Sequence, residues 1–341
     1  MNNILKKPAL LIVILTIVPT VILVFILSKD PIYSLYVFFT GPFSNKFNFG
    51  NMLNRTSPLI LTSLGAFIAL KSNSFNLGGE GQVYLGATVT GLILTNTAFI
   101  PSSLSLLLTI VIVLLTTGFV TFVSSILEEK YNVNSLISTY LISMILIYIC
   151  DYFVTNLFLL ENSNILTTKP IPEIFELKSL LPPSSLSSGF IIAVTIVIMF
   201  SFLLKNTVWG YEFTISGRNN AFSKSMGINN KKYKILGLTI SGALHGLAGY
   251  ILVTGSYHSV ISGFYMNLGW NGLSSALVAG SRPIMILISS LFFSYLDSGA
   301  SSATVLSDVT IELSTIIKSV IFFVISSKLI KDSLIKKGNK T

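Results

Sequence analysis

The chain consists of long apolar runs separated by short polar connections. The first run, residues 8–28, follows Lys6 and Lys7 and extends over 21 residues. About 20 apolar residues suffice to cross the hydrocarbon core of a bilayer as a helix. The run is longer than the apolar part of a signal peptide and lacks a small-x-small cleavage site. We therefore expect an uncleaved first transmembrane helix.

Nine further apolar segments follow, two of them short, so that ten spans are expected in all. A short loop separates the first span from the second. The nine segments cover residues 54–71, 72–94, 103–127, 133–160, 189–205, 235–256, 270–281, 284–300 and 310–328. The predicted fold is an all-α polytopic membrane protein with a single transmembrane domain over residues 1–341.

The composition excludes a soluble domain. Of the 341 residues, 52% are hydrophobic and 10% are charged, whereas soluble domains carry about 25% charged residues. The net charge of +9 would suit a nucleic-acid partner, but the basic residues are scattered between apolar runs and form no basic face. We expect membrane lipid and no nucleic acid around this chain.

The distribution of basic residues predicts the orientation. With both termini in the cytoplasm, sixteen Lys and Arg residues fall inside and five outside, as the positive-inside rule requires. The basic tail, residues 329–341, is then cytoplasmic and the loop 161–188 is external. Four prolines forbid a long helix in this loop. It is either a docking surface for an external partner or a passive connector.

A basic segment, residues 209–232, interrupts the apolar pattern. Its apolar side chains recur at spacings of seven and four residues, which places them on one face of a helix, and a glycine is positioned to end that helix. We expect a short amphipathic helix on the cytoplasmic surface, or a helix that rests on anionic lipid. The candidate contact residues are Ile215, Arg218, Phe222, Lys224, Met226 and Gly227.

Residues 76–81 and 267–272 share the pattern N-L-G-x-x-G. In the predicted topology they open helices that enter from opposite sides, as expected for an inverted repeat of spans 2–5 and 7–10. Glycines let the backbone leave helical geometry, and the next helix then presents unpaired N–H groups. The breaks line a solute path, or they permit close packing of helices while Glu80 caps a helix or pairs with a basic residue. The candidate path residues are Asn76, Glu80, Gln82 and Asn271.

Four charged residues lie in or near expected spans, where unpaired charge is costly. They are Asp151, Asp297, Glu312 and Lys318. Lys318 and Glu312 are six residues apart and cannot pair within one helix. Lys318 therefore needs a partner on another helix, with Asp297 one possibility, or lies near a water-filled cavity.

The sequence contains none of the common motifs for catalysis or metal binding. Cys150 is the single cysteine, which rules out an intrachain disulfide and a cysteine-based metal site. His245 and His258 have no carboxylate at metal-ligand spacing, and packing or interface roles are expected for them. There is no phosphate loop, H-E-x-x-H or G-x-S-x-G motif. We expect neither catalysis nor a cofactor in this chain.

Three stretches carry a resemblance to known transporters. They are F-N-L-G-G-E-G-Q-V-Y-L-G-A (75–87), G-Y-E-F…G-R-N-N-A-F-S-K-S-M-G-I-N-N-K-K-Y-K…S-G-A-L-H-G-L-A-G (210–249) and G-W-N-G-L-S-S-A-L-V-A-G-S-R-P (269–283). In this order they resemble ABC-importer permeases of the branched-chain amino acid, ribose and nucleoside superfamily, over most of residues 50–300. The external proline-bearing loop and K-N-T-V-W-G-Y-E-F resemble the nucleoside and simple-sugar uptake permeases most. The chain departs from the pattern at I-S-G-R (215–218), A-F-S-K (221–224) and Asn134-Ser135.

The resemblance implies a non-catalytic permease subunit in a bacterial cytoplasmic membrane. Its implied partners are a second permease subunit, an external substrate-binding lipoprotein and a cytoplasmic ATPase that binds the ATP. Segment 209–232 would be the coupling segment that contacts the ATPase. The competing hypothesis is an ion- or proton-coupled secondary transporter with Glu80, Glu312 and Lys318 as coupling charges.

Overall fold

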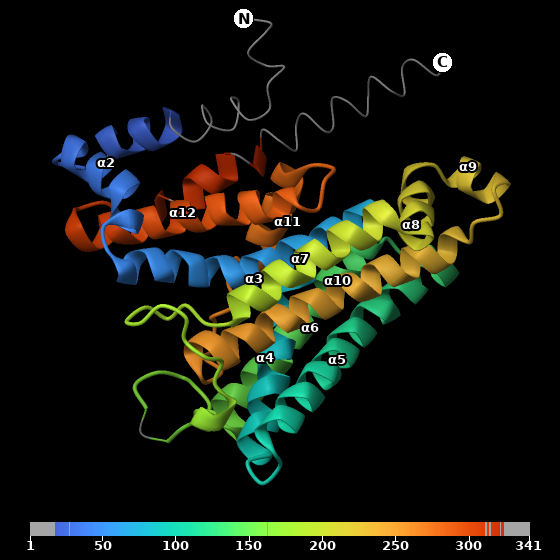
Figure 1. Cartoon of the computed structure of the whole chain (residues 1–341), viewed down its shortest axis with the longest axis horizontal. Helices are drawn as coiled ribbons and strands as arrows, with labels where there is room; N and C mark the ends of the chain where they lie inside the picture. Colours follow the sequence, from blue (N-terminus) through green and yellow to red (C-terminus); the bar gives the residue numbers. More distant parts are fainter. Residues whose placement is uncertain are drawn as a thin grey trace, which may run out of the picture. The chain divides into compact units, whose positions relative to one another are not determined.

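The fold is helical in the part of the chain that the computed structural model describes (Figure 1). The described residues are 18–26, 28–161, 163–310, 312–313, 315–320 and 322–323. Within them, β pairing is limited to isolated bridges. The expected all-α class is therefore confirmed. Most of the first expected span, 8–28, and the whole basic tail, 329–341, lie outside the described residues.

Most of the long helices overlap the expected apolar segments. In chain order they are α2 (Pro31–Thr40), η1 (Gly41–Phe43), α3 (Lys46–Lys71), α4 (Gly79–Asn96), α5 (Ser102–Tyr131), α6 (Ser135–Tyr152), η2 (Phe153–Leu157), η3 (Glu173–Phe175), α7 (Gly189–Asn206), α8 (Val208–Arg218), α9 (Asn220–Ser225), α10 (Asn230–Leu252), η4 (Val253–Tyr257), α11 (Leu268–Ala279) and α12 (Met285–Leu306). Residues 18–26, 312–313, 315–320 and 322–323 are also helical.

Four of the described helices are long and apolar enough to cross a membrane. They are Ser102–Tyr131, Ser135–Leu157, Gly189–Asn206 and Asn230–Tyr257. Each coincides with an expected span, and π-turns η2 and η4 extend the second and the fourth. This establishes a multi-span helical protein and leaves the count of ten as a prediction.

The chain forms two compact units, residues 54–290 and residues 1–53 with 291–341. In the first unit, α10 is the central helix and packs along α5 and α4 (Figure 1). Fourteen of its residues are buried, which is consistent with a helix surrounded by neighbours instead of lipid.

Small residues allow α10 to approach its neighbours closely. A Cβ atom added at Gly246 would lie 2.2 Å from Thr117 Oγ1 on α5, and one at Gly242 would lie 2.3 Å from Thr121 Oγ1. On α4, a Cβ at Gly86 would lie 2.3 Å from the carbonyl oxygen of Gly246. Glycines four residues apart commonly bring membrane helices together in this way. The helices α4, α5 and α10 therefore form a tightly packed core.

Gly86→Ala is expected to destabilise this core. The added methyl group meets backbone atoms of Gly246, which cannot move without displacing α10, and overpacking of this kind costs about 1–3 kcal/mol. Gly118→Ala on α5 is the matched control, because its Cβ would have its nearest neighbours at 3.5 Å and alanine favours the helix. Thermal unfolding in detergent should show a lower midpoint for Gly86→Ala only. Equal midpoints would contradict the close packing.

The second unit holds two features that bear on the sequence predictions. The prediction of a short loop before residue 54 is wrong, because α2, η1 and the first eight residues of α3 occupy this stretch. Asp30 caps α2 by accepting the Tyr33 N–H at 3.2 Å, and Pro31 takes the first helical position. The expected pairing of Lys318 is confirmed, because its Nζ lies 2.7 Å from Asp297 Oδ1.

The loop 161–188 contains no α-helix in its described residues, as its prolines predict. It is held on the segment after α10 by backbone hydrogen bonds. The N–H of Ile171 donates to the His258 oxygen at 2.7 Å, and the N–H of Leu177 donates to the Thr254 oxygen at 2.8 Å. The peptide bond Pro182–Pro183 is cis. Through these hydrogen bonds, the described part of the loop covers the segment after α10.

Candidate functional site

Segment 209–232 folds as two helices at one end of the unit, α8 and α9 (Figure 1). The prediction of a single amphipathic helix here is wrong, because the chain breaks between α8 and α9. Asn219 has extended backbone angles (φ −150°, ψ 95°) and its Oδ1 accepts the Phe222 N–H at 3.0 Å. A short amide side chain competes well for backbone groups, and it caps a new helix at this point. Ile215 therefore does not share a helix with Phe222 and Met226.

The end of α9 follows the predicted turn chemistry. Gly227 is left-handed (φ +77°), and the Ile228 N–H returns to the Ser223 oxygen at 2.9 Å. Asn229 caps α10 by accepting the Lys232 N–H at 3.1 Å. The sequence predicts the role of Gly227, and the two features together define α9 as a separate short element.

The side chain of Asn230, at the start of α10, holds α9 in place. Asn230 Oδ1 accepts the Ser223 hydroxyl at 2.5 Å, and its Nδ2 donates to the Asn220 oxygen at 2.9 Å. These bonds tie α9 to the start of α10. Because Ser223 is the buried residue of α9, the exposed face of α9 is fixed in direction.

α8 is fixed against the end of α3. A Cβ atom added at Gly217 would lie 1.9 Å from the Lys71 carbonyl oxygen, so the two backbones are in contact. Phe213 is fully buried and stacks on Trp209 with ring centroids 5.1 Å apart. Tyr233 on α10 packs edge-on against Phe213. Displacement of α8 must therefore move α3 and α10.

The exposed side of this segment is partly apolar. Phe222 and Met226 are 46% and 57% exposed, and Arg218 and Lys224 are exposed beside them. A cavity of about 610 Å³ lies under α9. Its polar lining includes Asn73, Asn220, Asn229, Lys224, Lys231 and Lys234. Exposed apolar side chains beside cations suit contact with a partner protein.

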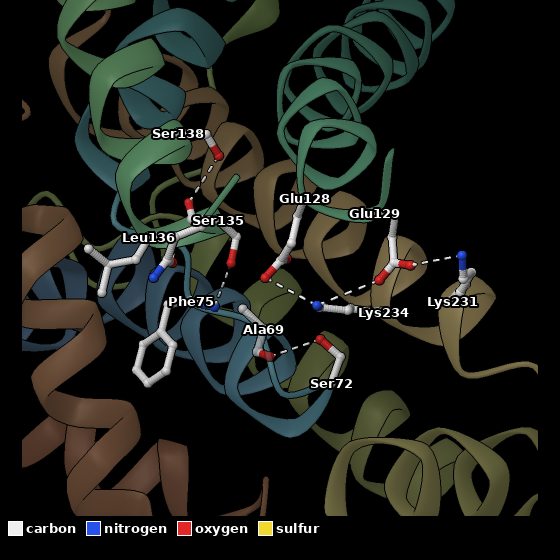
Figure 2. A network of polar contacts seen from close by, with 11 residues as sticks. Ala69, Ser72, Phe75, Glu128, Glu129, Ser135, Leu136, Ser138, Lys231 and Lys234 are labelled. Atoms are coloured by element: carbon white, nitrogen blue, oxygen red, sulfur yellow. Dashed lines mark hydrogen bonds and ion pairs between the residues drawn. The ribbon is translucent and has the colours of Figure 1, made fainter. Parts of the chain in front are cut away.

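An ion-pair cluster joins α5 to the start of α10 (Figure 2). Lys234 Nζ lies 3.1 Å from Glu128 Oε1 and 3.6 Å from Glu129 Oε1. Lys231 reaches Glu129 at 3.8 Å. Figure 2 shows Lys234 between the two carboxylates, with Lys231 on the far side of Glu129. The side chains of Glu128 and Glu129 are only 18% and 16% exposed, so Lys234 is the cation that two poorly solvated acids share.

Lys234→Met is expected to destabilise the unit because it leaves both glutamates without this cation. Removing one partner of a poorly solvated ion pair costs about 3–5 kcal/mol, and partial exposure reduces the expected cost here to about 2 kcal/mol. Lys232→Met is the control, since Lys232 is exposed and lies over the Tyr233 ring at 5.9 Å. Thermal unfolding in detergent should separate the two variants; equal midpoints would refute the role of Lys234.

The two N-L-G-x-x-G stretches meet in space. A Cβ atom at Gly79 would lie 3.0 Å from the Gly269 Cα, and one at Gly269 would lie 2.8 Å from the Glu80 nitrogen. The backbone N–H of Asn267 donates to Glu80 Oε1 at 2.7 Å. Asn267 has a left-handed backbone at φ 67° and directly precedes the first residue of α11. The starts of α4 and α11 are therefore in close contact at Gly79 and Gly269.

The four expected path residues separate into two environments. Asn76 and Gln82 are buried and bond reciprocally, with Nδ2 to Oε1 at 2.8 Å and Nε2 to Oδ1 at 2.9 Å. Asn76 Nδ2 also donates to Ser241 Oγ on α10 at 2.9 Å. Glu80 bonds the start of α11, and Asn271 lies partly exposed in the first turn of that helix. In this conformation Asn76 and Gln82 stabilise the break before α4.

A carboxylate and an aromatic stack extend this region. Asp151 on α6 accepts the Tyr84 hydroxyl at 2.6 Å and the Ser262 hydroxyl at 2.9 Å, both at Oδ1. The Tyr84 ring stacks on Tyr265 with centroids 4.6 Å apart. The sequence singled out Asp151 by its charge, but nothing in the spacing pointed to these tyrosines.

Histidine in this region serves packing. His245 is buried, with Gly65 and Gly79 against its ring, and its Nδ1 lies 2.7 Å from the Ser241 oxygen. Among the described residues, no group of three His, Cys, Asp or Glu side chains is arranged to hold a metal ion.

Apolar helices long enough to span a membrane, two glycine breaks in contact and a polar two-helix segment indicate a multi-pass membrane protein. The sequence pattern of the family described as branched-chain amino acid transport system / permease component matches residues 48–326, and the chain belongs to this family. It is the permease subunit of an ABC importer in the inner membrane.

Several curated proteins are similar along most of their length. A probable riboflavin import permease protein of Treponema pallidum is 27% identical over 88% of this chain and 80% of its own. A nucleoside ABC transporter permease protein of Lactococcus lactis is 26% identical over 91% and 87%. A guanosine ABC transporter permease protein of Bacillus subtilis is 26% identical over 87% of each chain. No solved structure matches.

Proposed function

We propose that this permease imports a nucleoside, or a simple sugar, with energy from a separate ATPase subunit. The observation that carries the proposal is the α8–α9 segment, whose exposed Phe222 and Met226 lie on elements rigidly joined to the spanning helices. The chain itself is non-catalytic, and ATP binds to the partner. Relatives named for nucleoside and guanosine transport support the choice of solute.

The proposed topology has ten spans with both termini in the cytoplasm and with spans 2–5 and 7–10 as inverted halves. The contact between the starts of α4 and α11 supports this arrangement, because equivalent breaks of two inverted halves meet at the centre of such folds. Segment 209–232 is then cytoplasmic and loop 161–188 is external.

The proposed partners follow from these positions. The ATPase contacts α8 and α9 through the coupling residues Ile215, Arg218, Phe222, Lys224, Met226 and Gly227, with the exposed apolar side chains as anchors. A second permease subunit completes the membrane part, and a substrate-binding lipoprotein delivers the solute at the external loop.

The proposed mechanism transmits movement of the ATPase through two rigid contacts. ATP-driven closure displaces α9 and α8. Gly217 carries this displacement to α3, and the Lys234 cluster carries it to α5 and α10. These helices hold the breaks at Asn76 and Asn267, so the path opens on one side and closes on the other. Asn76, Glu80, Gln82 and Asn271 then offer hydrogen bonds to the solute.

The solute is tested by reconstitution. The permease, its ATPase and its binding protein are placed in proteoliposomes with ATP on the ATPase side, and uptake of labelled guanosine, adenosine and ribose is measured. ATP-dependent uptake of a nucleoside is expected. Uptake of ribose alone would overturn the nucleoside assignment.

A further inference from the structure

A short strap, residues 261–267, crosses α4 and α6 just before α11. Its Ser262 hydroxyl donates to Asp151, and the N–H of Asn267 donates to Glu80 at 2.7 Å. Between these two bonds, Tyr265 stacks on Tyr84 at 4.6 Å with ring planes 30° apart. The strap thus places a flat ring between two carboxylates and supplies each carboxylate with a hydrogen-bond donor.

Asp151 retains acceptor capacity at this place. Both of its side-chain hydrogen bonds reach Oδ1, so Oδ2 is free to accept another donor, and the side chain is partly exposed. It lies on a helix long and apolar enough to span a membrane. A charged group in a spanning helix faces water, a partner group or a solute. Tyr148, 70% exposed and three residues earlier, lies on the same helical face.

The strap carries the same kinds of functional group as a solute that would bind here. The strap supplies an aromatic ring from Tyr265, a hydroxyl from Ser262 and an N–H from Asn267. A solute made of a heterocycle and a hydroxylated sugar or sugar alcohol carries the same three groups. Ring stacking on tyrosine recognises any flat base, and carboxylates accept strong hydrogen bonds from hydroxyl and N–H donors.

We propose that Tyr84, Asp151 and Glu80 form a solute-binding constriction, and that the strap occupies it until the solute displaces Tyr265. The proposal rests on the proposed nucleoside import and adds the residues and the ligand class. The ligand is a neutral solute with a flat nitrogen heterocycle joined to a hydroxylated sugar or sugar-alcohol group. Guanosine and riboflavin both have this architecture. Phosphorylated forms are excluded, because two carboxylates repel a phosphate group.

The test uses opposite effects at the two stacked tyrosines. In the complete reconstituted complex, with guanosine-loaded binding protein at saturation, Tyr84→Leu removes the platform and should lower the guanosine uptake rate at least tenfold. Tyr265→Ala removes the competing ring and should leave that rate unchanged or higher. A purely structural stack predicts losses at both positions, and this result would overturn the proposal.

The carboxylate is tested in the same preparation. Asp151→Asn should lower guanosine uptake at least tenfold while the thermal unfolding midpoint stays close to that of the wild type. Tyr140→Phe, an exposed residue of the same helix, is the control and should transport normally. Guanosine 5′-phosphate should not be taken up. Guanosine uptake at the wild-type rate by Asp151→Asn would refute the site while leaving nucleoside import intact, whereas absence of guanosine uptake by the wild-type complex would refute the proposed function itself.

Discussion

Phe222→Asp is expected to abolish ATP-driven uptake, a loss of at least a hundredfold, while the protein still inserts and folds. Phe222 is 46% exposed on α9, so its replacement does not disturb the packed core. A buried aromatic anchor at a protein interface is typically worth about 2–4 kcal/mol, and aspartate adds a charge that the interface would have to desolvate.

The measurement compares uptake with retention of the ATPase on the purified permease. Phe222→Leu keeps an apolar side chain at this position. This variant should retain most of the uptake and most of the bound ATPase. Normal uptake by Phe222→Asp would contradict the assignment of α9 to the ATPase contact.

Gly217→Ala is expected to uncouple hydrolysis from transport, with uptake reduced about tenfold or more. The added methyl group would lie 1.9 Å from the Lys71 carbonyl oxygen, a distance that forces the backbone of α8 away from α3. Such overpacking costs about 1–3 kcal/mol when the structure must relax. The contact that carries movement from α8 into α3 is lost in the process.

The decisive readout is the ratio of solute transported to ATP hydrolysed, which should fall in Gly217→Ala. Gly118→Ala is again the control, since its added Cβ meets only ordinary contacts. An unchanged ratio in Gly217→Ala would show that movement does not pass through this contact.

The helices were largely predictable because an apolar run long enough to span a bilayer has few alternatives to a helix. The start of α3 was missed because Lys46, Asn48 and Asn51 interrupt the apolar pattern. The pairing of Lys318 with Asp297 could be predicted from the sequence. A cation in a transmembrane span needs an acidic partner, and this chain has few acidic residues.

The break between α8 and α9 illustrates the limit of periodicity. Spacings of seven and four between Ile215, Phe222 and Met226 fit one continuous helix, but Asn219 offers a cap that ends one helix and starts another. That asparagine was the available signal. The apolar spacing does not distinguish the two outcomes, because the energy of a cap depends on local backbone geometry.

The candidate site was predictable only in part. The repeated N-L-G-x-x-G pattern identified both breaks, but the bond from Asn267 to Glu80 joins residues 187 positions apart. The reciprocal bonding of Asn76 and Gln82 and the stack of Tyr84 on Tyr265 likewise depend on how helices approach one another. A single sequence carries no record of such pairings.

The source of energy is the most direct test of the account. Proteoliposomes holding the permease, its ATPase and its binding protein are supplied with labelled guanosine and either ATP or an imposed proton or sodium gradient. The account predicts uptake with ATP alone, and none when the ATPase carries a substitution that prevents hydrolysis. Uptake driven by an ion gradient without ATP and without the ATPase would contradict it.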